Sequence, residues 1–300
     1  MAGGDPGDPV VISLLVLVGV CLFWGGIGSS RVVHQIRYHP SLTPTDYGLS
    51  WEPLRLMAAD GVSISGWLIP AKSPRGILLL LHGFGTCKAD LMDVAQAFHQ
   101  GGPFHLILID FRGHGDSGGR TISFGHRELR DIQAVLELVD SSLGWRHLPV
   151  GCYGISMGGA IGLLAAARFP RIRAVVTDSA YASLSKTIAR IQWLSYHIPQ
   201  IPLGQMVIWG TQLRLGCRMR HLSPISVIDK IAPRGVLIIH GGNDPSIPPE
   251  EGEALFRSAG EPKDFWRVPG AGHVSSFYRE KEPYVQRVMG FFQDAFCRET

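Results

Sequence analysis

The stretch Gly-Ile-Ser-Met-Gly, from Gly154 to Gly158, constrains the fold more than any other part of the chain. It lies between an apolar run, 150–153, and a run of small residues, 159–167. This pattern predicts a strand, a sharp turn and a helix, with Ser156 at the apex of the turn. Glycines two residues before and after the serine let the strand and helix backbones approach more closely than a Cβ atom allows. The segment therefore favours an α/β fold that exposes a serine hydroxyl.

Apolar runs and amphipathic segments alternate along most of the chain. After a predicted hairpin, 54–69, the apolar runs indicate strands that are buried on both faces, as in a parallel sheet. The predicted strands are 76–81, 106–109, 150–153, 174–176, 236–239 and 265–268, and the predicted helices are 89–100, 127–142, 158–168, 250–258 and 283–296. Strands that alternate with helices predict a single α/β domain with a doubly wound, mostly parallel sheet.

One interval between two predicted strands, 179–234, is longer than a crossover helix requires. Two segments in it, 184–196 and 203–215, are predicted to be helical and are unusually apolar, and 223–231 resembles a returning helix of the core. We therefore expect a small helical cap, inserted at about 181–222. Its apolar side chains either pack the insert on the sheet or form a lid over a pocket.

The segment from Val10 to Ile27 contains no charged residue and is just long enough to cross a bilayer as a helix. Acidic residues precede it, whereas a cleaved signal peptide has a basic region before its apolar core. A retained anchor over 10–28 is the favoured interpretation. The alternatives are a signal peptide cleaved near 28–30, which would give a secreted protein, and a buried core helix. Arginines follow the anchor, so the positive-inside tendency places the rest of the chain in the cytoplasm.

These features divide the chain into four parts. Residues 1–9 are an N-terminal tail, 10–28 the membrane anchor, 29–53 a linker and 54–300 the α/β domain with its cap. Pro, Thr and Ser are frequent within 39–52, as is typical of a linker.

Composition excludes several classes of partner. The net charge of +3 comes from scattered Lys and Arg without a basic block, so we expect no nucleic-acid partner. The five cysteines are widely spaced with no Cys-x-x-Cys pair, which indicates neither a disulfide framework nor a zinc site. A reducing compartment fits this pattern, and nothing in the sequence calls for a metal or an organic cofactor.

A serine hydroxyl is a poor nucleophile near neutral pH and needs a general base, which an acid must orient. Two loops supply candidates directly after predicted strands: one carries Asp244 and the other carries His273. Open α/β sheets place their sites at this edge. We expect Ser156 as nucleophile, His273 as base and Asp244 as acid, while Asp178, which also ends a predicted strand, is the alternative acid.

The oxyanion of an acyl-transfer intermediate requires hydrogen-bond donors. The sequence His-Gly-Phe-Gly, 82–85, directly follows the predicted strand 76–81, and its glycines allow the N–H of Phe84 to face the pocket. The N–H of Met157 begins the helix after the serine, where unpaired N–H groups favour negative charge. We expect these two N–H groups to form an oxyanion hole.

Five motifs in this order resemble those of the α/β-hydrolase superfamily, and the resemblance covers roughly 54–296. The motifs are 81–85, 110–117, the turn at Ser156, 242–244 and 272–273. Among subfamilies, the chain is similar to the esterase, lipase and serine-aminopeptidase-like group, which includes membrane-anchored members. The resemblance implies an eight-stranded sheet, hydrolysis without a metal or cofactor, and Ser156, Asp244 and His273 as a catalytic triad.

The leading hypothesis is a membrane-tethered serine hydrolase that cleaves esters or thioesters of small-molecule or lipid-like acyl substrates through an acyl-enzyme. An amidase or peptidase with the same triad is the closest rival. A non-catalytic binding protein with this fold is a further alternative, although such proteins usually lack a triad member. Other polar residues are expected to hold turns or to lie in the core: His82, Asp110, Arg112, His114 and His240.

Overall fold

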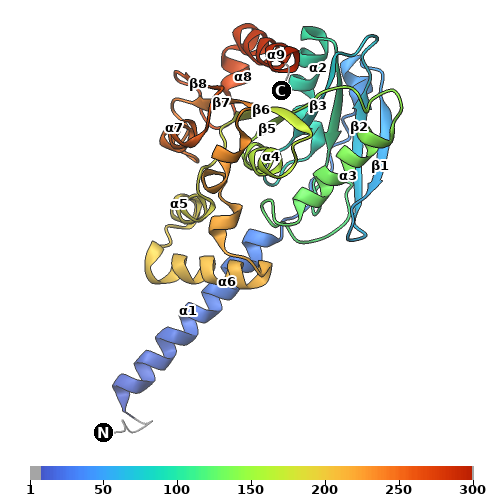
Figure 1. The fold of residues 1–300 in the computed structure, drawn as a ribbon. Helices are drawn as coiled ribbons and strands as arrows, with labels where there is room; N and C mark the ends of the chain where they lie inside the picture. Colours follow the sequence, from blue (N-terminus) through green and yellow to red (C-terminus); the bar gives the residue numbers. More distant parts are fainter. Residues whose placement is uncertain (1–7, 299–300) are drawn as a thin grey trace.

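The computed structural model describes residues 8–298, so residues 1–7 of the predicted N-terminal tail lie outside the described residues. The strands are β1 Glu52–Met57, β2 Ser63–Ile69, β3 Gly76–Leu81, β4 Phe104–Ile109, β5 Val150–Ile155, β6 Ile172–Asp178, β7 Gly235–Gly241 and β8 Lys263–Val268. They form one eight-stranded sheet in the order β1-β2-β4-β3-β5-β6-β7-β8 (Figure 1). The predicted hairpin β1–β2 and the pair β2–β4 are antiparallel, and all later neighbours are parallel. The mostly parallel sheet is confirmed.

Helices cover both faces of the sheet, as the doubly wound prediction requires. They are α2 Met92–Gly101, α3 Glu128–Ser141, α4 Met157–Arg168, α7 Pro249–Ser258, the short α8 Ser276–Arg279 and α9 Lys281–Cys297. Side chains of β3 alternate between two apolar clusters, because successive residues of a strand point to opposite faces. Leu79 packs in the cluster that contains α3, α4 and α7, whereas Leu78 and Leu80 pack in the cluster that contains α2 and α9. This alternation explains why the strand is apolar at every position.

The interval between β6 and β7 contains the predicted cap helices, α5 Leu184–Tyr196 and α6 Gln205–Leu215. The predicted core helix 223–231 is wrong, because the chain forms only short 3-10 turns there. Val227 leaves the helical region, with φ −142° and ψ −8°. The Ser226 hydroxyl also donates to the carbonyls of Arg220 and Ser223, and such local bonds compete with a regular helix.

The N-terminal helix, α1 Pro9–Val33, projects from the body of the molecule (Figure 1). It begins where the Asp8 side chain accepts the N–H of Val10 at 2.8 Å. The helix extends beyond the predicted end at residue 28, so 29–33 are helical rather than linker. It is long and apolar enough to cross a bilayer, a criterion that a signal sequence also meets. Most of its apolar side chains are exposed, so it is not a buried core helix.

Candidate active site

Ser156 occupies the turn between β5 and α4 in a conformation that serine rarely adopts, with φ +50° and ψ −118°. The surrounding glycines permit this turn. A Cβ atom on Gly154 would lie 2.5 Å from the carbonyl carbon of Gly158, and one on Gly158 would overlap the carbonyl oxygen of Leu81. The predicted strand, sharp turn and helix are therefore present. A side chain at Gly154 would force β5 and α4 apart, and one at Gly158 would force α4 away from the end of β3.

Three loops at the carboxyl edge of the sheet bring Ser156, Asp244 and His273 together. His273 Nε2 lies 3.0 Å from Ser156 Oγ, and His273 Nδ1 lies 2.7 Å from Asp244 Oδ2. The other carboxylate oxygen of Asp244 accepts the backbone N–H groups of Ser246 and Ile247, each at 2.9 Å. Asp244 is buried, so these contacts hold it in one orientation behind the histidine.

The environment of Asp244 favours its ionised form. Burial pushes the pKa of this carboxyl upward, but the hydrogen bond and charge of His273, together with the N–H of Ile247, outweigh burial and hold the pKa below its usual value. An ionised Asp244 accepts a hydrogen bond from the protonated Nδ1 of His273. Nε2 is then unprotonated and can accept a hydrogen bond from the Ser156 hydroxyl. The geometry is thus suited to removing a proton from Ser156.

Asp178, the alternative acid, has different partners. It accepts hydroxyl hydrogens from Ser179, Ser276 and Tyr284 at 3.0–3.1 Å. Burial raises its pKa to about 6. Its carboxylate is hydrogen-bonded to no histidine in the described chain, so the structure pairs His273 with Asp244 and not with Asp178.

The two predicted oxyanion donors lie beside the serine. Phe84 and Met157 line the same cavity as Ser156 and His273. An added Cβ at Gly83 would lie 3.6 Å from the Cβ of Ser156, so the turn that carries Phe84 passes directly next to the serine. Within residues 8–298, no protein acceptor takes the N–H of Phe84 or of Met157, and both groups are available to another acceptor.

Comparison with known proteins supports the same architecture. Residues 72–207 match the family model described as serine aminopeptidase, S33, which includes the serine turn but neither Asp244 nor His273. The chain is 28% identical to YqkD of Bacillus subtilis, with 79% of this chain and 77% of YqkD covered. It is 27% identical to YfhR of Escherichia coli K12, with 96% and 95% covered.

Among solved structures, the Pyrococcus furiosus esterase Pf2001 superposes with a TM-score of 0.75 at 24% identity. The match covers 87% of this chain and 97% of the esterase. The chain has the α/β-hydrolase fold. The eight-stranded, mostly parallel sheet and the serine turn agree with the predicted fold, and the family match supports a hydrolase as the general class.

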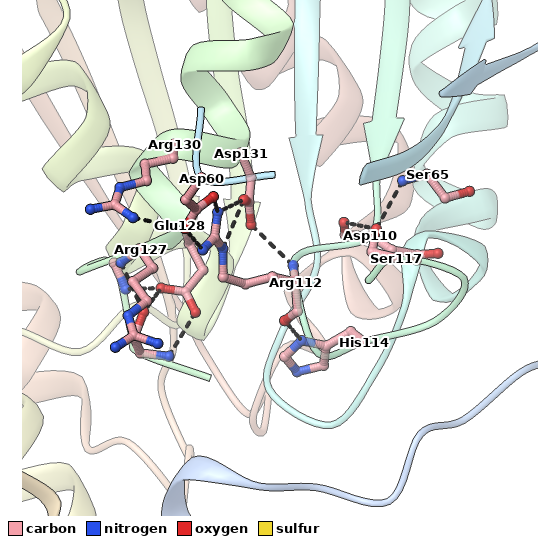
Figure 2. Close-up of polar contacts among 12 residues, drawn as sticks. Asp60, Ser65, Asp110, Arg112, His114, Ser117, Arg127, Glu128, Arg130 and Asp131 are labelled. Carbon is pink, nitrogen blue, oxygen red and sulfur yellow. Dashed lines mark hydrogen bonds and ion pairs between the residues drawn. The ribbon is translucent and has the colours of Figure 1, made fainter. Parts of the chain in front are cut away.

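Buried charged residues hold the turns around the site, and several of them are residues that were predicted to hold turns (Figure 2). Arg112 donates to Asp131 at 2.6 and 2.9 Å and to Asp60 at 2.6 and 3.0 Å. Asp110 accepts the buried Lys88 ammonium at 2.5 Å, and His82 Nε2 accepts the N–H of Phe111 at 3.0 Å. These bonds stay within the protein and fix loops around the site.

The cavity over Ser156 has a volume of about 700 Å³ and lies between the body, the cap and α1. Apolar side chains dominate its walls, among them Phe124 on the body, Leu184 and Ile188 on α5, and Val207 on α6. The apolar helices of the cap pack on the body, as an insert that covers the sheet would, and they also line the cavity, as a lid would. No Asp or Glu is among the lining residues of the described chain.

Sequence reasoning missed the contribution of α1 to this cavity. Its lining residues there are Trp24, Ile27, Gly28, Arg31 and Val32, followed by Gln35 just after the helix. A segment that is apolar on every side has no helical face that the sequence could single out. Only the tertiary contact with the cap identifies these residues.

Proposed function

We propose that this chain is a membrane-anchored serine hydrolase that cleaves carboxylic esters or thioesters with apolar acyl groups. The observation that carries the proposal is the hydrogen-bonded series Asp244–His273–Ser156, which ends in an apolar cavity. Such a series supplies a nucleophile, a general base and an acid that orients the base.

In the proposed reaction, Ser156 Oγ attacks the acyl carbonyl carbon while its proton moves to His273 Nε2. The N–H groups of Phe84 and Met157 stabilise the oxyanion of the tetrahedral intermediate. When this intermediate collapses, the leaving alcohol or thiol takes the proton from His273, and the acyl group remains on Ser156. Water then attacks the acyl-enzyme, with His273 as base, and releases the carboxylic acid. These steps need no metal or organic cofactor.

The cavity walls favour an acyl substrate over a peptide with a free amino terminus. An aminopeptidase must bind an ammonium group, and a carboxylate is the usual partner for it. The lining residues within the described chain include no carboxylate, whereas their apolar side chains suit an acyl chain. An amidase that acts on an apolar acyl amide remains the second candidate, because the matched family model is named for serine aminopeptidases.

The proposed location is a single-pass membrane protein with its catalytic domain in the cytoplasm. Arg31 and Arg37 follow the apolar segment, and the positive-inside tendency supports this orientation. Protease treatment of sealed vesicles tests it. Digestion of the catalytic domain from the non-cytoplasmic side would contradict the orientation.

Labelling with a fluorophosphonate tests the nucleophile directly. We expect the wild type to be labelled, and Ser156→Ala to lose both the label and about 10⁴-fold or more of kcat on an ester. Ser141→Ala, on the exposed end of α3, is the matched serine control and should keep both. A folded wild type that neither reacts nor hydrolyses esters would overturn the proposal. Faster turnover of amides than of esters with the same acyl group would favour the amidase.

A further inference from the structure

We infer that α1 forms a wall of the acyl-binding cavity and that this cavity opens sideways into the bilayer, so that the substrate is an acyl lipid taken directly from the membrane. The inference rests on the proposed function and names the substrate class for the same site. Five observations lead to it: the packing of α1 on α6, the lining of the cavity, the length of α1, the apolar surface of the cap, and the charge of the cap.

The C-terminal half of α1 is packed against the cap rather than held as a free tether. A Cβ atom on Gly28 would lie 2.5 Å from Val207 Cγ2, and one on Gly210 would lie 2.8 Å from Ser29 Oγ. Arg214 of α6 adds hydrogen bonds to Ser29 Oγ at 2.9 Å and to the Gly26 carbonyl at 3.0 Å. Close approach at small residues is typical of helix pairs in membranes. The small residues considered as a cleavage site are therefore part of a helix–helix contact.

The same part of α1 faces the site. Trp24, Ile27 and Val32 line the cavity that also contains Ser156 and His273. The space above the nucleophile is therefore continuous with the surface of α1. Without this helix, the cavity would lose one of its apolar walls.

The length of α1 determines where the cavity lies relative to a bilayer. A hydrocarbon core about 30 Å thick requires about 20 helical residues at 1.5 Å each. Counted from Val10, which follows the charged Asp8, such a span ends near Ser29. If α1 were inserted less deeply, only the mostly exposed stretch from Val10 to Trp24 would lie in the membrane. This stretch is about 22 Å long, which is shorter than the hydrocarbon core is thick. The contact with α6 and the lining residue Ile27 therefore lie at the hydrocarbon boundary.

The outer surface of the cap is apolar beside the part of α1 that lies at the hydrocarbon boundary. Trp209 and Leu213, one turn apart on α6, are 57% and 85% exposed, and Trp193, Tyr196 and Ile201 of the cap are also largely exposed. Figure 1 shows α6 crossing α1 where that helix leaves the body. Exposed apolar surface of this kind beside an apolar span is suited to the membrane interface.

The charge of the cap selects a lipid surface as the partner. Residues 181–222 contain five Lys or Arg and no Asp or Glu: Lys186, Arg190, Arg214, Arg218 and Arg220. The chain as a whole has 25 acidic residues, so their absence here is a local feature. The net positive charge of this segment attracts anionic lipid headgroups. It also repels the same face of a second copy, which makes a dimer through this surface unfavourable.

The double variant Trp209→Asp/Leu213→Asp tests lateral entry in the full chain, reconstituted in vesicles of phosphatidylcholine and phosphatidylglycerol. Two rates are measured for each protein: hydrolysis of a long-chain monoacylglycerol in the vesicles, and hydrolysis of water-soluble p-nitrophenyl butyrate. We expect the ratio of the first rate to the second to fall about tenfold or more, because two large apolar contacts with the membrane are lost. Thermal unfolding verifies that the variant is folded.

Leu143→Asp is the matched control, because Leu143 is also apolar and 79% exposed. It lies between α3 and the amino end of β5, at the opposite edge of the sheet from Ser156, and its variant should keep the wild-type ratio. A ratio within about twofold of wild type in the double variant would overturn lateral entry while leaving the hydrolase proposal intact. An unchanged ratio together with loss of a dimer would assign this face to a second copy instead. A folded wild type with neither activity would overturn the proposed function and this inference with it.

Discussion

Buried carboxylates occur in two regions at the carboxyl edge of the sheet, and only one of these regions leads to the cavity. In the turns after β4, Asp110 is enclosed by protein donors. Asp131 on α3 is enclosed in the same way and pairs with Arg112 of these turns (Figure 2). After β7, Asp244 is equally buried, but its partner His273 reaches Ser156 and lines the cavity. The first region uses its hydrogen bonds to hold loops. The second ends at a hydroxyl that a substrate can reach.

Asp178 shows why burial alone does not distinguish these roles. It ends β6, the strand next to β7, and is as buried as the other carboxylates. Its three hydroxyl partners belong to the protein framework. The comparison teaches that a buried acid at a strand end becomes a candidate for catalysis only through its contact with a histidine that faces the cavity.

The largest expected effect separates the two acids at neighbouring strand ends. Asp244→Asn should lower kcat about 10⁴-fold, because an amide favours the wrong tautomer of His273. Asp178→Asn should lower kcat by less than about tenfold, since it leaves the His273 contacts in place. Steady-state kinetics on a soluble ester measures both variants. A larger loss for Asp178→Asn would reverse the assignment of the acid.

A smaller effect is expected on the stability of the enclosed region. Arg112→Ala leaves Asp131 buried without its ion-pair partner and should lower the free energy of unfolding by about 3–5 kcal/mol. Urea denaturation measures this change. Arg257→Ala is the control, because Arg257 is 67% exposed and lies 3.6 Å from Glu253 on the same helix. An exposed pair of this kind contributes less than about 1 kcal/mol. Equal losses in the two variants would show that the enclosed pair is not a structural element.

The smallest effect concerns pH and again uses Asp178→Asn. Burial raises the pKa of Asp178 in the folded protein to about 6, from an ordinary value of 3.8. The contribution of the protonated Asp178 carboxyl to the free energy of unfolding is therefore fully present below the pKa of the unfolded state. It is lost as pH rises through the pKa of the folded state. Asparagine does not ionise, so the variant should gain up to about 3 kcal/mol relative to wild type between about pH 4 and pH 7.

Unfolding free energies of the two proteins, measured across this range, provide the check. A difference between the two unfolding free energies that does not change with pH reflects the exchange of carboxyl for amide. The prediction concerns only the part of the difference that changes with pH. Parallel pH profiles would mean that Asp178 keeps an ordinary pKa in the folded state, and that its three hydroxyl donors compensate for burial.

Much of the fold follows from local patterns in the sequence. The apolar runs of β3 to β7 predict buried parallel strands because side chains of a strand alternate between two covered faces. The cap helices are recognisable from their high apolar content as well. The predicted helix 223–231 failed because the pattern does not reveal the non-helical backbone of Val227 or the side-chain bonds of Ser226. The extension of α1 to Val33 was missed because its contacts are tertiary: Arg214 of α6 donates to Ser29, and the N–H of Ile122 on the body donates to the Val33 carbonyl.

The sequence by itself determined the serine turn, because both glycines and the apolar runs that flank them lie within one short segment, and the clash that requires Gly154 arises inside this strand–turn–helix unit. It also determined that two carboxylates and a histidine, Asp178, Asp244 and His273, lie at or directly after the ends of strands. Only the tertiary structure decided that His273 meets Asp244 rather than Asp178, and that α1 lines the cavity above Ser156. The physical reason is distance along the chain. Ser156 and His273 are 117 residues apart, and their contact depends on sheet order and loop conformation, which no local pattern encodes.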